Sequence, residues 1–437
     1  MKYYLAIDIG ASSGRAIVGH YHDNKEIILE EIYRFKNRPL EKDDDLIWNI
    51  DYLFQEVKNG IKEALKKYPT IISVSIDTWG CDYVLLDKDD KEIYPVYCYR
   101  SQRTKKSIKE VHKLISFDEL YNINGCQFQE FNTIYQLYAD KLNHRLDQAS
   151  SFLMIPEYLM FKLTGRKIKE LTNASTTGLI DKNKQYSAQI RDTLFKNYPI
   201  FDELQLPGTE VGHFKEEIIK EVGGDIKVIL CSTHDTGSAV EALDIDNNDI
   251  YISSGTWSLL GVKSDKFIVS DVSKKANYSN ELGPNYVRFQ KNIMGLWIIQ
   301  RLAEEFNLDF VTMMNMAKES NYQEIYDVND NNFLSSFKMS EAIRKYFIER
   351  DIASPKSQND FINATYHSLA YSYKVAIEEL ENITNKIYRR IIIIGGGAKN
   401  EYLNELTGRY TNKEVVPLPI EATSLGNIKS QMEVDNR

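Results

Sequence analysis

The hydrophobic and polar positions of this chain follow two different periods, which predict strands and helices in succession. Short apolar runs at Tyr3–Ile9, Ile71–Ile76 and Arg390–Ile394 are typical of buried strands. From Leu46 to Tyr68, apolar side chains recur every three or four positions, which predicts an amphipathic helix that Pro69 ends. This succession of strands and helices indicates an α/β fold with mixed sheets.

The pattern at the start of the chain returns near its middle. After Tyr3–Ile9 come a small polar turn and two further predicted strands, Ala16–Tyr21 and Glu26–Phe35, joined by a turn at Asp23-Asn24. The stretch Asp249–Lys263 repeats the order strand, small polar turn, strand. A pattern that restarts indicates two similarly built domains, which we place at residues 1–245 and 246–437.

Composition and charge narrow the functional class. The 437 residues are 43% hydrophobic and carry a formal net charge of −9, which argues against a nucleic-acid surface. The four cysteines form no CxxC pair and match no zinc spacing, so we expect reduced thiols. No apolar run approaches membrane-spanning length, and no basic-then-apolar leader precedes the first strand. These features predict a cytoplasmic protein that binds neither nucleic acid nor membrane.

The stretch Cys231–Val240 carries the strongest candidate for chemistry. It follows the short apolar run Ile226–Leu230, a predicted strand, and small residues after Asp235 favour the start of a helix. A carboxylate at such a junction is held on rigid elements beside free backbone N–H groups, so Asp235 is a candidate general base. The alternative is that Asp235 only caps the helix, a common role of aspartate.

Glycine-bearing turns are the second chemical signal. The turn after Asp8 contains Gly10 and Gly14, and its free N–H groups can wrap phosphate oxygens, while Asp8 can hold a metal ion through water. Gly395-Gly396-Gly397 follows a predicted strand and lets a flat ring or a phosphate approach the backbone. An ordinary glycine hairpin and a sterically tight turn are the respective alternatives. Trp79 beside Gly80 fits either a sugar-holding surface or a core tryptophan.

Taken together, these motifs resemble the FGGY family of carbohydrate kinases over nearly the whole chain and in the same order. The matching residues are Asp8 with Ala11-Ser12-Ser13-Gly14-Arg15, Asp77-Thr78-Trp79-Gly80, His234-Asp235-Thr236, Ser254-Gly255-Thr256-Trp257-Ser258, Asn292-Ile293-Met294-Gly295-Leu296-Trp297 and Gly395-Gly396-Gly397. The resemblance implies two ribonuclease-H-like domains of the actin–hexokinase type, with mixed sheets around a central cleft. It also implies phosphorylation of L-rhamnulose at its 1-hydroxyl, dependent on ATP and Mg²⁺, in rhamnose catabolism.

The resemblance further implies a role for each matching position. Asp235 is the expected proton acceptor, and Asp8 is the carboxylate expected to hold Mg²⁺. The expected sugar-binding residues are Gly80, His234, Asp235, Thr236 and Asn292. The expected ATP-binding residues are Ala11, Ser12, Ser13, Gly14, Arg15, Thr256, Gln300 and Gly396.

Three alternatives and one departure accompany this interpretation. The chain could encode a kinase for another ketose such as fuculose or xylulose, a non-catalytic sugar or nucleotide sensor of the same fold, or an actin-like structural protein. Asp8 and Asp235 argue against the sensor, because a pure binder needs no base. The departure is the end of the chain: the family pattern continues through further helical sequence after Glu421–Asn427, whereas Ile428–Arg437 finish this chain, and the residues from Lys429 on look charged and unpatterned. The resemblance therefore implies a shortened C-terminus that has lost a terminal helix.

Overall fold

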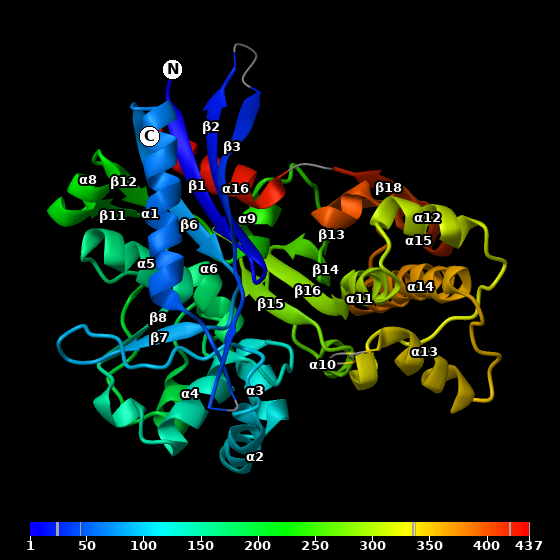
Figure 1. Ribbon diagram of the computed structural model, residues 1–437. Coiled ribbons are helices and arrows are strands. Elements are labelled where there is room, and N and C mark those ends of the chain that lie inside the picture. Colours follow the sequence, from blue (N-terminus) through cyan, green and yellow to red (C-terminus); the bar gives the residue numbers. More distant parts are fainter. Residues whose placement is uncertain (23–25, 44, 334–335, 337, 419–420, 437) are drawn as a thin grey trace. The chain divides into compact units, whose positions relative to one another are not determined.

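The structure is a computed structural model that describes residues 1–22, 26–43, 45–333, 336, 338–418 and 421–436 (Figure 1). The predicted turn at Asp23-Asn24 lies outside the described residues. The chain forms two compact units. The first unit comprises Met1–Asp244, Ser264–Arg288 and Glu421–Arg437, and the second comprises Ile245–Lys263 and Phe289–Ile420. The chain thus first leaves the first unit after Asp244 and later returns to it twice.

A six-stranded mixed sheet lies at the centre of the first unit, in the order β11-β12-β6-β1-β2-β3. Its strands are β1 (Tyr3–Ile9), β2 (Ser13–Tyr21), β3 (Ile27–Lys36), β6 (Ile71–Thr78), β11 (Glu210–His213) and β12 (Lys227–Ile229). β1 runs antiparallel to β2 and parallel to β6, which runs parallel to β12. The carboxyl ends of β1, β6 and β12 therefore meet at one edge of the sheet.

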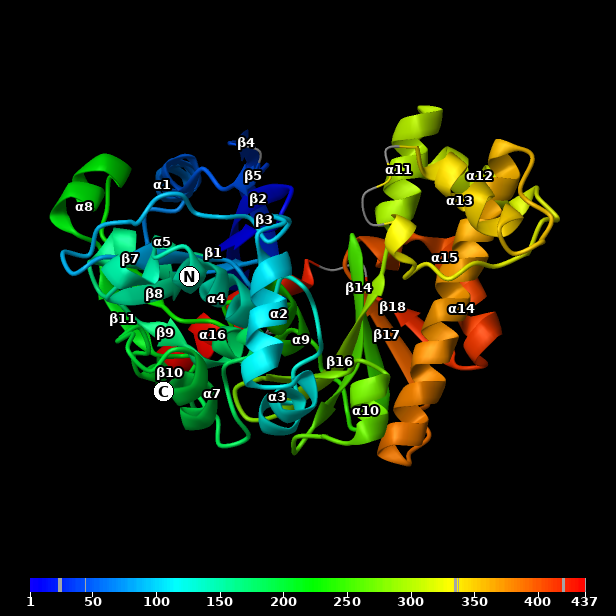
Figure 2. The same ribbon diagram turned by 90° about the horizontal axis from the view of Figure 1, so that it is seen from below.

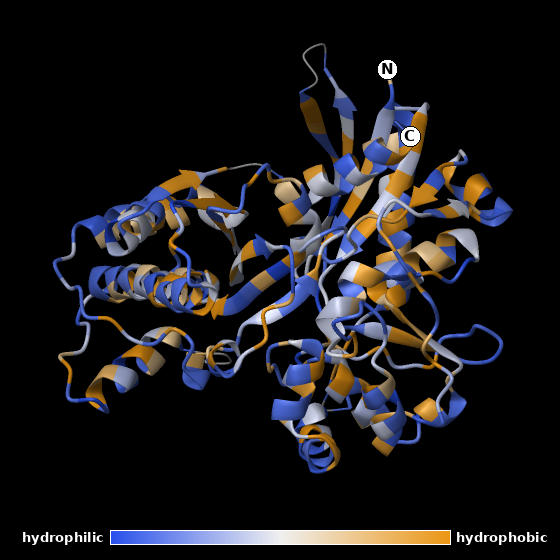
Figure 3. Ribbon diagram, turned by 180° about the vertical axis from the view of Figure 1, so that it is seen from behind, coloured by the Kyte–Doolittle hydropathy of each residue, from blue (hydrophilic) through white to orange (hydrophobic). Residues whose placement is uncertain are grey.

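The first unit also contains shorter strands and several helices. The strand pairs are β4 (Leu40–Lys42) with β5 (Asp45–Ile47), β7 (Tyr83–Leu86) with β8 (Ser151–Met154), and β9 (Lys169–Glu170) with β10 (Leu204–Gln205). The helices are α1 (Ile50–Lys67), α2 (Thr104–Leu114), α3 (Phe117–Asn124), α4 (Thr133–Leu142), α5 (Ile155–Thr164), α6 (Leu171–Ala174), α7 (Ala188–Leu194), α8 (Glu216–Val222), α9 (Asp235–Glu241), α10 (Asp271–Lys275) and α16 (Ala422–Asp435), with the 3₁₀ turns η1 (Leu146–Gln148) and η2 (Ser175–Thr177). Figure 3 shows hydrophobic and hydrophilic residues interspersed along the helices, as amphipathic packing requires.

Helix α1 begins later than its apolar pattern predicts. The predicted start at Leu46 is wrong, because Leu46 lies in β5 and the helix starts at Ile50. The Asn49 side chain accepts a hydrogen bond from the Tyr52 N–H at 3.0 Å and so satisfies one of the donors that the first turn leaves free. The periodic apolar face, which includes Leu53, packs toward β2 and β3.

The end of the chain is helical, which corrects the prediction of an unpatterned terminus. α16, red in Figure 1, packs against β1, β6 and α9 within the first unit. Ile428 and Met432 are buried in one cluster with Tyr4 of β1. Asn427 and Gln431 are buried on the same helix. These polar residues break the apolar period, so the sequence pattern does not reveal the helix.

The second six-stranded sheet has the order β15-β16-β14-β13-β17-β18. Its strands are β13 (Asp249–Ser254), β14 (Trp257–Ser264), β15 (Ser279–Leu282), β16 (Val287–Met294), β17 (Arg390–Ile394) and β18 (Glu414–Pro417). The helices of the second unit are α11 (Trp297–Phe306), α12 (Phe310–Lys318), α13 (Met339–Ile348), α14 (Gln358–Thr384) and α15 (Glu401–Thr411), with the 3₁₀ turns η3 (Asn331–Phe333) and η4 (Gly396–Lys399). α14 and α15 pack against each other, and α15 packs against β18 (Figure 2).

Both sheets are mixed, which confirms the predicted α/β class. β13 runs antiparallel to β14 and parallel to β17, just as β1 runs antiparallel to β2 and parallel to β6. The opening pattern of the chain therefore does restart at Asp249. Within the described residues, the structure contains no helix with both the length and the hydrophobicity of a membrane span.

Candidate active site

The carboxyl edge of the first sheet brings neighbouring aspartates together. Asp8 near the end of β1 is the in-register partner of Asp77 on the parallel strand β6. Asp235 opens α9, and the preceding residue, His234, forms a β-bridge with Thr78 at the end of β6. Ligands of α/β sheets bind outside the carboxyl ends of the strands, so this edge has the position of a substrate site.

Asp235 does not occupy the cap position of α9. It is the first residue inside α9, and His234 occupies the cap position without a side-chain hydrogen bond to the helix. The Asp235 carboxylate accepts from the Thr236 hydroxyl at 3.1 Å, and 32% of its side chain is exposed. A capping aspartate precedes the helix and binds N–H groups two or three residues further on. Asp235 instead presents a partly exposed carboxylate that can accept a proton from a bound hydroxyl.

His234 links Asp235 to the predicted sugar-binding glycine. Its Nε2 lies 3.4 Å from Asp235 Oδ1, and a Cβ atom at Gly80 would lie 3.3 Å from the same nitrogen. Glycine therefore leaves room for the imidazole. His234 Nδ1 lies 3.7 Å from Glu281 Oε2, which lies 3.4 Å from Nη2 of the buried Arg288. The imidazole is thus held between two carboxylates and beside Gly80.

Trp79, in contrast, is a core residue. Its indole N–H donates to Asp82 at 2.9 Å, and its ring lies 4.3 Å from that of Trp48, measured between centroids. Trp48 donates to the same oxygen of Asp82 at 2.6 Å. Of the two interpretations of Trp79, the structure supports the core one, because its indole is used in packing.

The first glycine-bearing turn joins β1 to β2. The Gly10 N–H donates to the Ser13 carbonyl at 2.9 Å, and the Asn37 side chain donates to the Gly10 carbonyl at 2.9 Å. Gly14 is explained by packing, because a Cβ atom there would lie 2.1 Å from the Phe35 ring. The other predicted phosphate ligands of the turn keep exposed or half-buried positions; these are Ala11, Ser12, Ser13 and Arg15.

Arg15 forms ion pairs with two carboxylates at this edge. Its Nη2 donates to Asp8 Oδ2 at 2.6 Å, and its Nη1 donates to Glu421 at the start of α16. The Ser424 hydroxyl donates to the same oxygen of Asp8 at 3.4 Å. The predicted phosphate ligand and the predicted metal ligand are therefore in direct contact.

The electrostatics of this edge favour a cation. Burial raises the pKa of Asp8, opposed by Arg15, and the charge of Asp235 adds to the rise. Burial also raises the pKa of Asp77 well above its usual range, and the charges of Asp8 and Asp235 add to it. Asp77 Oδ1 is buried and has no hydrogen-bond partner among the described residues. Carboxylate oxygens suit Mg²⁺, so these residues fit that ion.

Any such ion needs further ligands. In the part of the chain that the structure describes, no three His, Cys, Asp or Glu side chains are grouped closely enough to hold a metal ion on their own. Mg²⁺ usually keeps several waters and takes one or two carboxylates together with substrate phosphates. The geometry therefore fits an ion that arrives with a phosphate-bearing ligand.

In the second unit, Thr256 lies in the turn between β13 and β14. The Thr256 carbonyl accepts from the Gly295 N–H at 3.1 Å, just before α11. A Cβ atom at Gly295 would lie 2.6 Å from the Gly255 carbonyl oxygen, so only glycine allows this contact without a shift of the backbone. Gln300, the predicted ATP ligand of α11, is half-buried in the first turn of that helix.

The three consecutive glycines pack against the same turn. Gly395 has a φ of +79°, and a Cβ atom at Gly397 would lie 2.0 Å from the Ser254 hydroxyl oxygen. At Gly396, the nearest atom to such a Cβ is the Ser254 carbonyl oxygen at 3.9 Å. Gly395 and Gly397 are therefore required by the fold, whereas Gly396 has open space. This space is where a ligand can approach the backbone.

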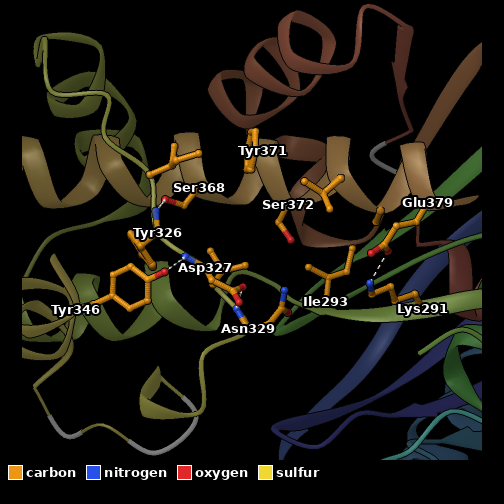
Figure 4. A pocket seen from close by; sticks show the side chains of 14 residues that line it. Lys291, Ile293, Tyr326, Asp327, Asn329, Tyr346, Ser368, Tyr371, Ser372 and Glu379 are labelled. Carbon is orange, nitrogen blue, oxygen red and sulfur yellow. Dashed lines mark hydrogen bonds and ion pairs between the residues drawn. The ribbon is translucent and has the colours of Figure 1, made fainter. Parts of the chain in front are cut away.

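A pocket of about 440 Å³ lies elsewhere in the second unit (Figure 4). Lys291 of β16 pairs with Glu379 of α14 at one side of it, at 2.6 Å. The described residues that line it do not include Thr256, Gln300 or Gly396. Asn292, the predicted sugar ligand of β16, also does not belong to this lining. The pocket is therefore separate from the predicted nucleotide-binding residues.

Comparison with known proteins identifies the class. Residues 3–240 match the N-terminal domain of the FGGY family of carbohydrate kinases, and residues 250–432 match its C-terminal domain. The chain belongs to the FGGY family of carbohydrate kinases, as its motifs predict, and as a carbohydrate kinase it binds a sugar and ATP.

Within that family, the chain is similar to rhamnulokinases. It is 43% identical to the rhamnulokinase of Halalkalibacterium halodurans, over 99% of this chain and 93% of that protein. It is also 43% identical to the rhamnulokinase of Oceanobacillus iheyensis, over 98% of this chain and 92% of that protein. The crystal structure of a ligand-bound xylulose kinase from Lactobacillus acidophilus has the same fold, with a TM-score of 0.82 and 16% identity over 100% of this chain and 90% of that one.

The structure adds residues to the site that the sequence motifs do not assign to it. Asp77 belongs to a matched motif, but its pairing with Asp8 follows from strand register. The signal available in the sequence is that Asp8 lies near the end of one apolar run and Asp77 directly follows another. Glu281 and Asn427 have no such signal, because Asn427 lies 350 residues from its partner Asp77.

Proposed function

We propose that the protein transfers the γ-phosphoryl group of ATP to the 1-hydroxyl of L-rhamnulose, giving L-rhamnulose 1-phosphate and ADP in rhamnose catabolism. The observation that carries the reaction class is the position of Asp235 at the carboxyl edge of the first sheet, beside His234 and Gly80. The choice of sugar is supported by relatives at 34–43% identity that are named rhamnulokinases and that match over 98–99% of this chain and 88–93% of their own lengths.

In this proposal Asp235 is the general base. The 1-hydroxyl oxygen attacks the γ-phosphorus, Asp235 takes the hydroxyl proton, and the bond from that phosphorus to the ADP oxygen breaks. An alcohol is too weakly acidic to ionise first, so the proton leaves as the attack proceeds. Gly80, His234 and Thr236 hold the sugar in the first unit, and Asn292 is the proposed sugar ligand in the second. Their task is orientation, which phosphoryl transfer needs more than covalent help.

The nucleotide is held by turns rather than by a charged pocket. We assign phosphate contacts to Ala11, Ser12, Ser13, Gly14 and Arg15 of the first turn and to Thr256 of the second, with Gln300 and Gly396 as further ATP ligands. Asp8 is the proposed ligand of Mg²⁺, with Asp77 beside it. When bound, Mg²⁺ neutralises negative charge on the phosphates and so stabilises the transferring group.

A coupled ADP-release assay tests the proposal. The protein is supplied with ATP, Mg²⁺ and a panel of L-rhamnulose, L-fuculose and D-xylulose. We expect kcat/KM for L-rhamnulose to exceed that for the other ketoses by about tenfold or more. Phosphorus NMR of the product then shows whether the phosphate is on the 1-hydroxyl. The matched control is Asp235→Asn, which keeps the size of the side chain.

Each alternative gives a different outcome. Preference for L-fuculose or D-xylulose identifies a kinase for another ketose and contradicts the proposed sugar. ADP binding without ADP release on any ketose identifies a sensor and contradicts the proposed reaction.

A further inference from the structure

The last helix of the chain contacts the candidate cation site directly. Asn427 of α16 donates from Nδ2 to Asp77 Oδ2 at 2.6 Å, and neither residue is exposed to solvent. Ser424 of the same helix donates to Asp8, and Glu421 at its start accepts from Arg15. α16 thus touches the charged groups at this edge of the sheet, although it is separated from them by most of the chain.

The two carboxylate oxygens of Asp77 have different surroundings. Asn427 holds Oδ2, whereas Oδ1 is buried and has no partner among the described residues. A buried polar atom without a partner costs about 1–3 kcal/mol. In a site where the rest of the side chain is fixed, such an atom indicates a ligand that donates a hydrogen bond.

The charges at this edge favour a cation with its bound waters as this ligand. Asp8 and Asp77 lie side by side on parallel strands, and the negative charge of Asp235 contributes to the raised pKa of both. The Arg15 guanidinium donates hydrogen bonds to both Asp8 and Glu421. The carboxylates at this edge therefore exceed the positive charge that faces them, so the edge favours a cation and its waters over an anion.

We propose that Asp77, fixed by Asn427, is a positioning residue for the divalent cation of the nucleotide, whose bound water donates a hydrogen bond to Asp77 Oδ1. The inference rests on the part of the proposed function that concerns nucleotide binding, and not on the choice of sugar. Asp8 remains the carboxylate proposed to hold the ion through water, and Asp77 orients another of the waters bound to that ion. Groups in that position orient metal-bound water, and their loss typically lowers metal affinity by about tenfold to a hundredfold.

The test measures cation binding without sugar and without turnover. Mn²⁺ replaces Mg²⁺ as a paramagnetic probe, ADP is present in excess, and electron paramagnetic resonance gives the Kd of Mn²⁺. Asp77→Asn keeps the shape of the side chain but removes its charge, so we expect the Kd to rise by about tenfold or more. Binding of ADP without metal should change by less than about twofold. An unchanged Mn²⁺ Kd in folded Asp77→Asn overturns the proposal.

A second variant covers the case that Asp77→Asn does not fold. Asn427→Ala keeps the carboxylate and removes the group that fixes it, so we expect a rise in the Mn²⁺ Kd of about threefold to tenfold. The matched control is Tyr4→Phe. Tyr4 lies on β1, and its hydroxyl donates to Asp435 of α16 at 2.7 Å, so it also joins this helix to the sheet but at the opposite end of the helix from Asn427.

Tyr4→Phe separates positioning from general stability. We expect it to lower the melting temperature and leave the Mn²⁺ Kd unchanged. If it raises that Kd as much as Asn427→Ala does, the effect is structural and the proposal is wrong. Failure of the sugar assignment is visible separately, because it appears only in the ketose assay and not in the Mn²⁺ and ADP measurement.

Discussion

The two units share one arrangement of strands but carry different chemistry at its edge. In the first unit, Asp8 lies two residues before the turn glycine Gly10 and pairs in register with Asp77. In the second unit, Ser253 lies two residues before Gly255 and pairs in register with Ile394. The same position in the same topology is thus occupied by paired carboxylates in one unit and by a hydroxyl and an apolar side chain in the other.

This difference separates two tasks of a kinase. The acidic edge can accept a proton and attract a cation, both of which need carboxylates. The neutral edge is built from glycines and backbone groups, and Gly295, Gly395 and Gly397 bring its segments into close contact. Backbone N–H groups and hydroxyls bind phosphate without adding negative charge. In our proposal, the carboxylates that the reaction needs therefore lie on one copy of the repeated fold only, whereas turns that bind the nucleotide lie on both.

The largest expected effect is the loss of the base on the acidic edge. Asp235→Asn should lower kcat by a factor of about a hundred or more, because general base catalysis contributes that much. ADP binding should persist, since Asp235 is not among the proposed ATP ligands. Steady-state kinetics on L-rhamnulose and calorimetry with ADP measure the two. Near-full kinase activity in this variant contradicts the assignment of the base.

A carboxylate placed on the neutral edge tests the comparison itself. Ser253→Asp copies the first unit at the corresponding position, and its charge should repel the phosphates, so we expect the KM for ATP to rise by about tenfold. Ser253→Asn is the neutral control of the same size and should raise it less. Equal KM values in the two variants mean that charge at this position does not matter and that the second edge is not specialised.

Thr256→Val is expected to have a smaller effect. It removes one hydroxyl from the second turn and keeps the shape of the side chain, so one hydrogen bond to phosphate is lost, worth about threefold to tenfold in affinity. The KM for ATP should rise more than the KM for the sugar. The reverse order would remove this turn from the nucleotide site.

The sequence predicts the strands of both edges well because their signals are local. Tyr3–Ile9 and Arg390–Ile394 have the same bounds in the structure as in the apolar pattern. The apolar period places the start of α1 too early, because it does not register the cap at Asn49. The pattern does not reveal α16, because the residues that this helix buries include Asn427 and Gln431, whose partners lie on β1 and β6. A buried polar helix face looks like an exposed one until its partners are known.

The site was predictable only as far as its residues lie in motifs. Asp8 lies inside an apolar run and Asp235 comes shortly after one, so their places near strand ends are implied by the pattern alone. The contact of His234 with Gly80 and Glu281 depends on how distant segments meet, which no local pattern contains. Gly396 differs from its neighbours Gly395 and Gly397 only in the open space around it, and this requires the packing of Ser254.

The smallest expected effect concerns buried titratable groups, whose pKa values are shifted in opposite directions in the two units. Burial raises the pKa of Asp77 in the first unit but lowers the pKa of His367 in the second, where nearby Arg409 adds to the shift. His367 is 6% exposed, and its Nδ1 lies 2.8 Å from the Tyr410 hydroxyl. A lowered pKa in the folded state means that the unfolded chain binds the proton more readily. The contribution of His367 to stability is therefore fully present above the unfolded value, about 6.5, and is lost as the pH falls through the folded value.

His367→Gln removes this titration and keeps a polar side chain near Tyr410. At pH 8 the variant should be less stable than the parent protein, because it loses a fitted ring. As the pH falls to 5, the difference in melting temperature should shrink by about 1–2 °C, since only the parent loses stability through His367. Calorimetry of both proteins across this range measures the difference. A difference in melting temperature that widens as the pH falls would show that the folded state binds the proton on His367 more tightly than the unfolded chain does. It would contradict the opposite directions of the pKa shifts of His367 and Asp77.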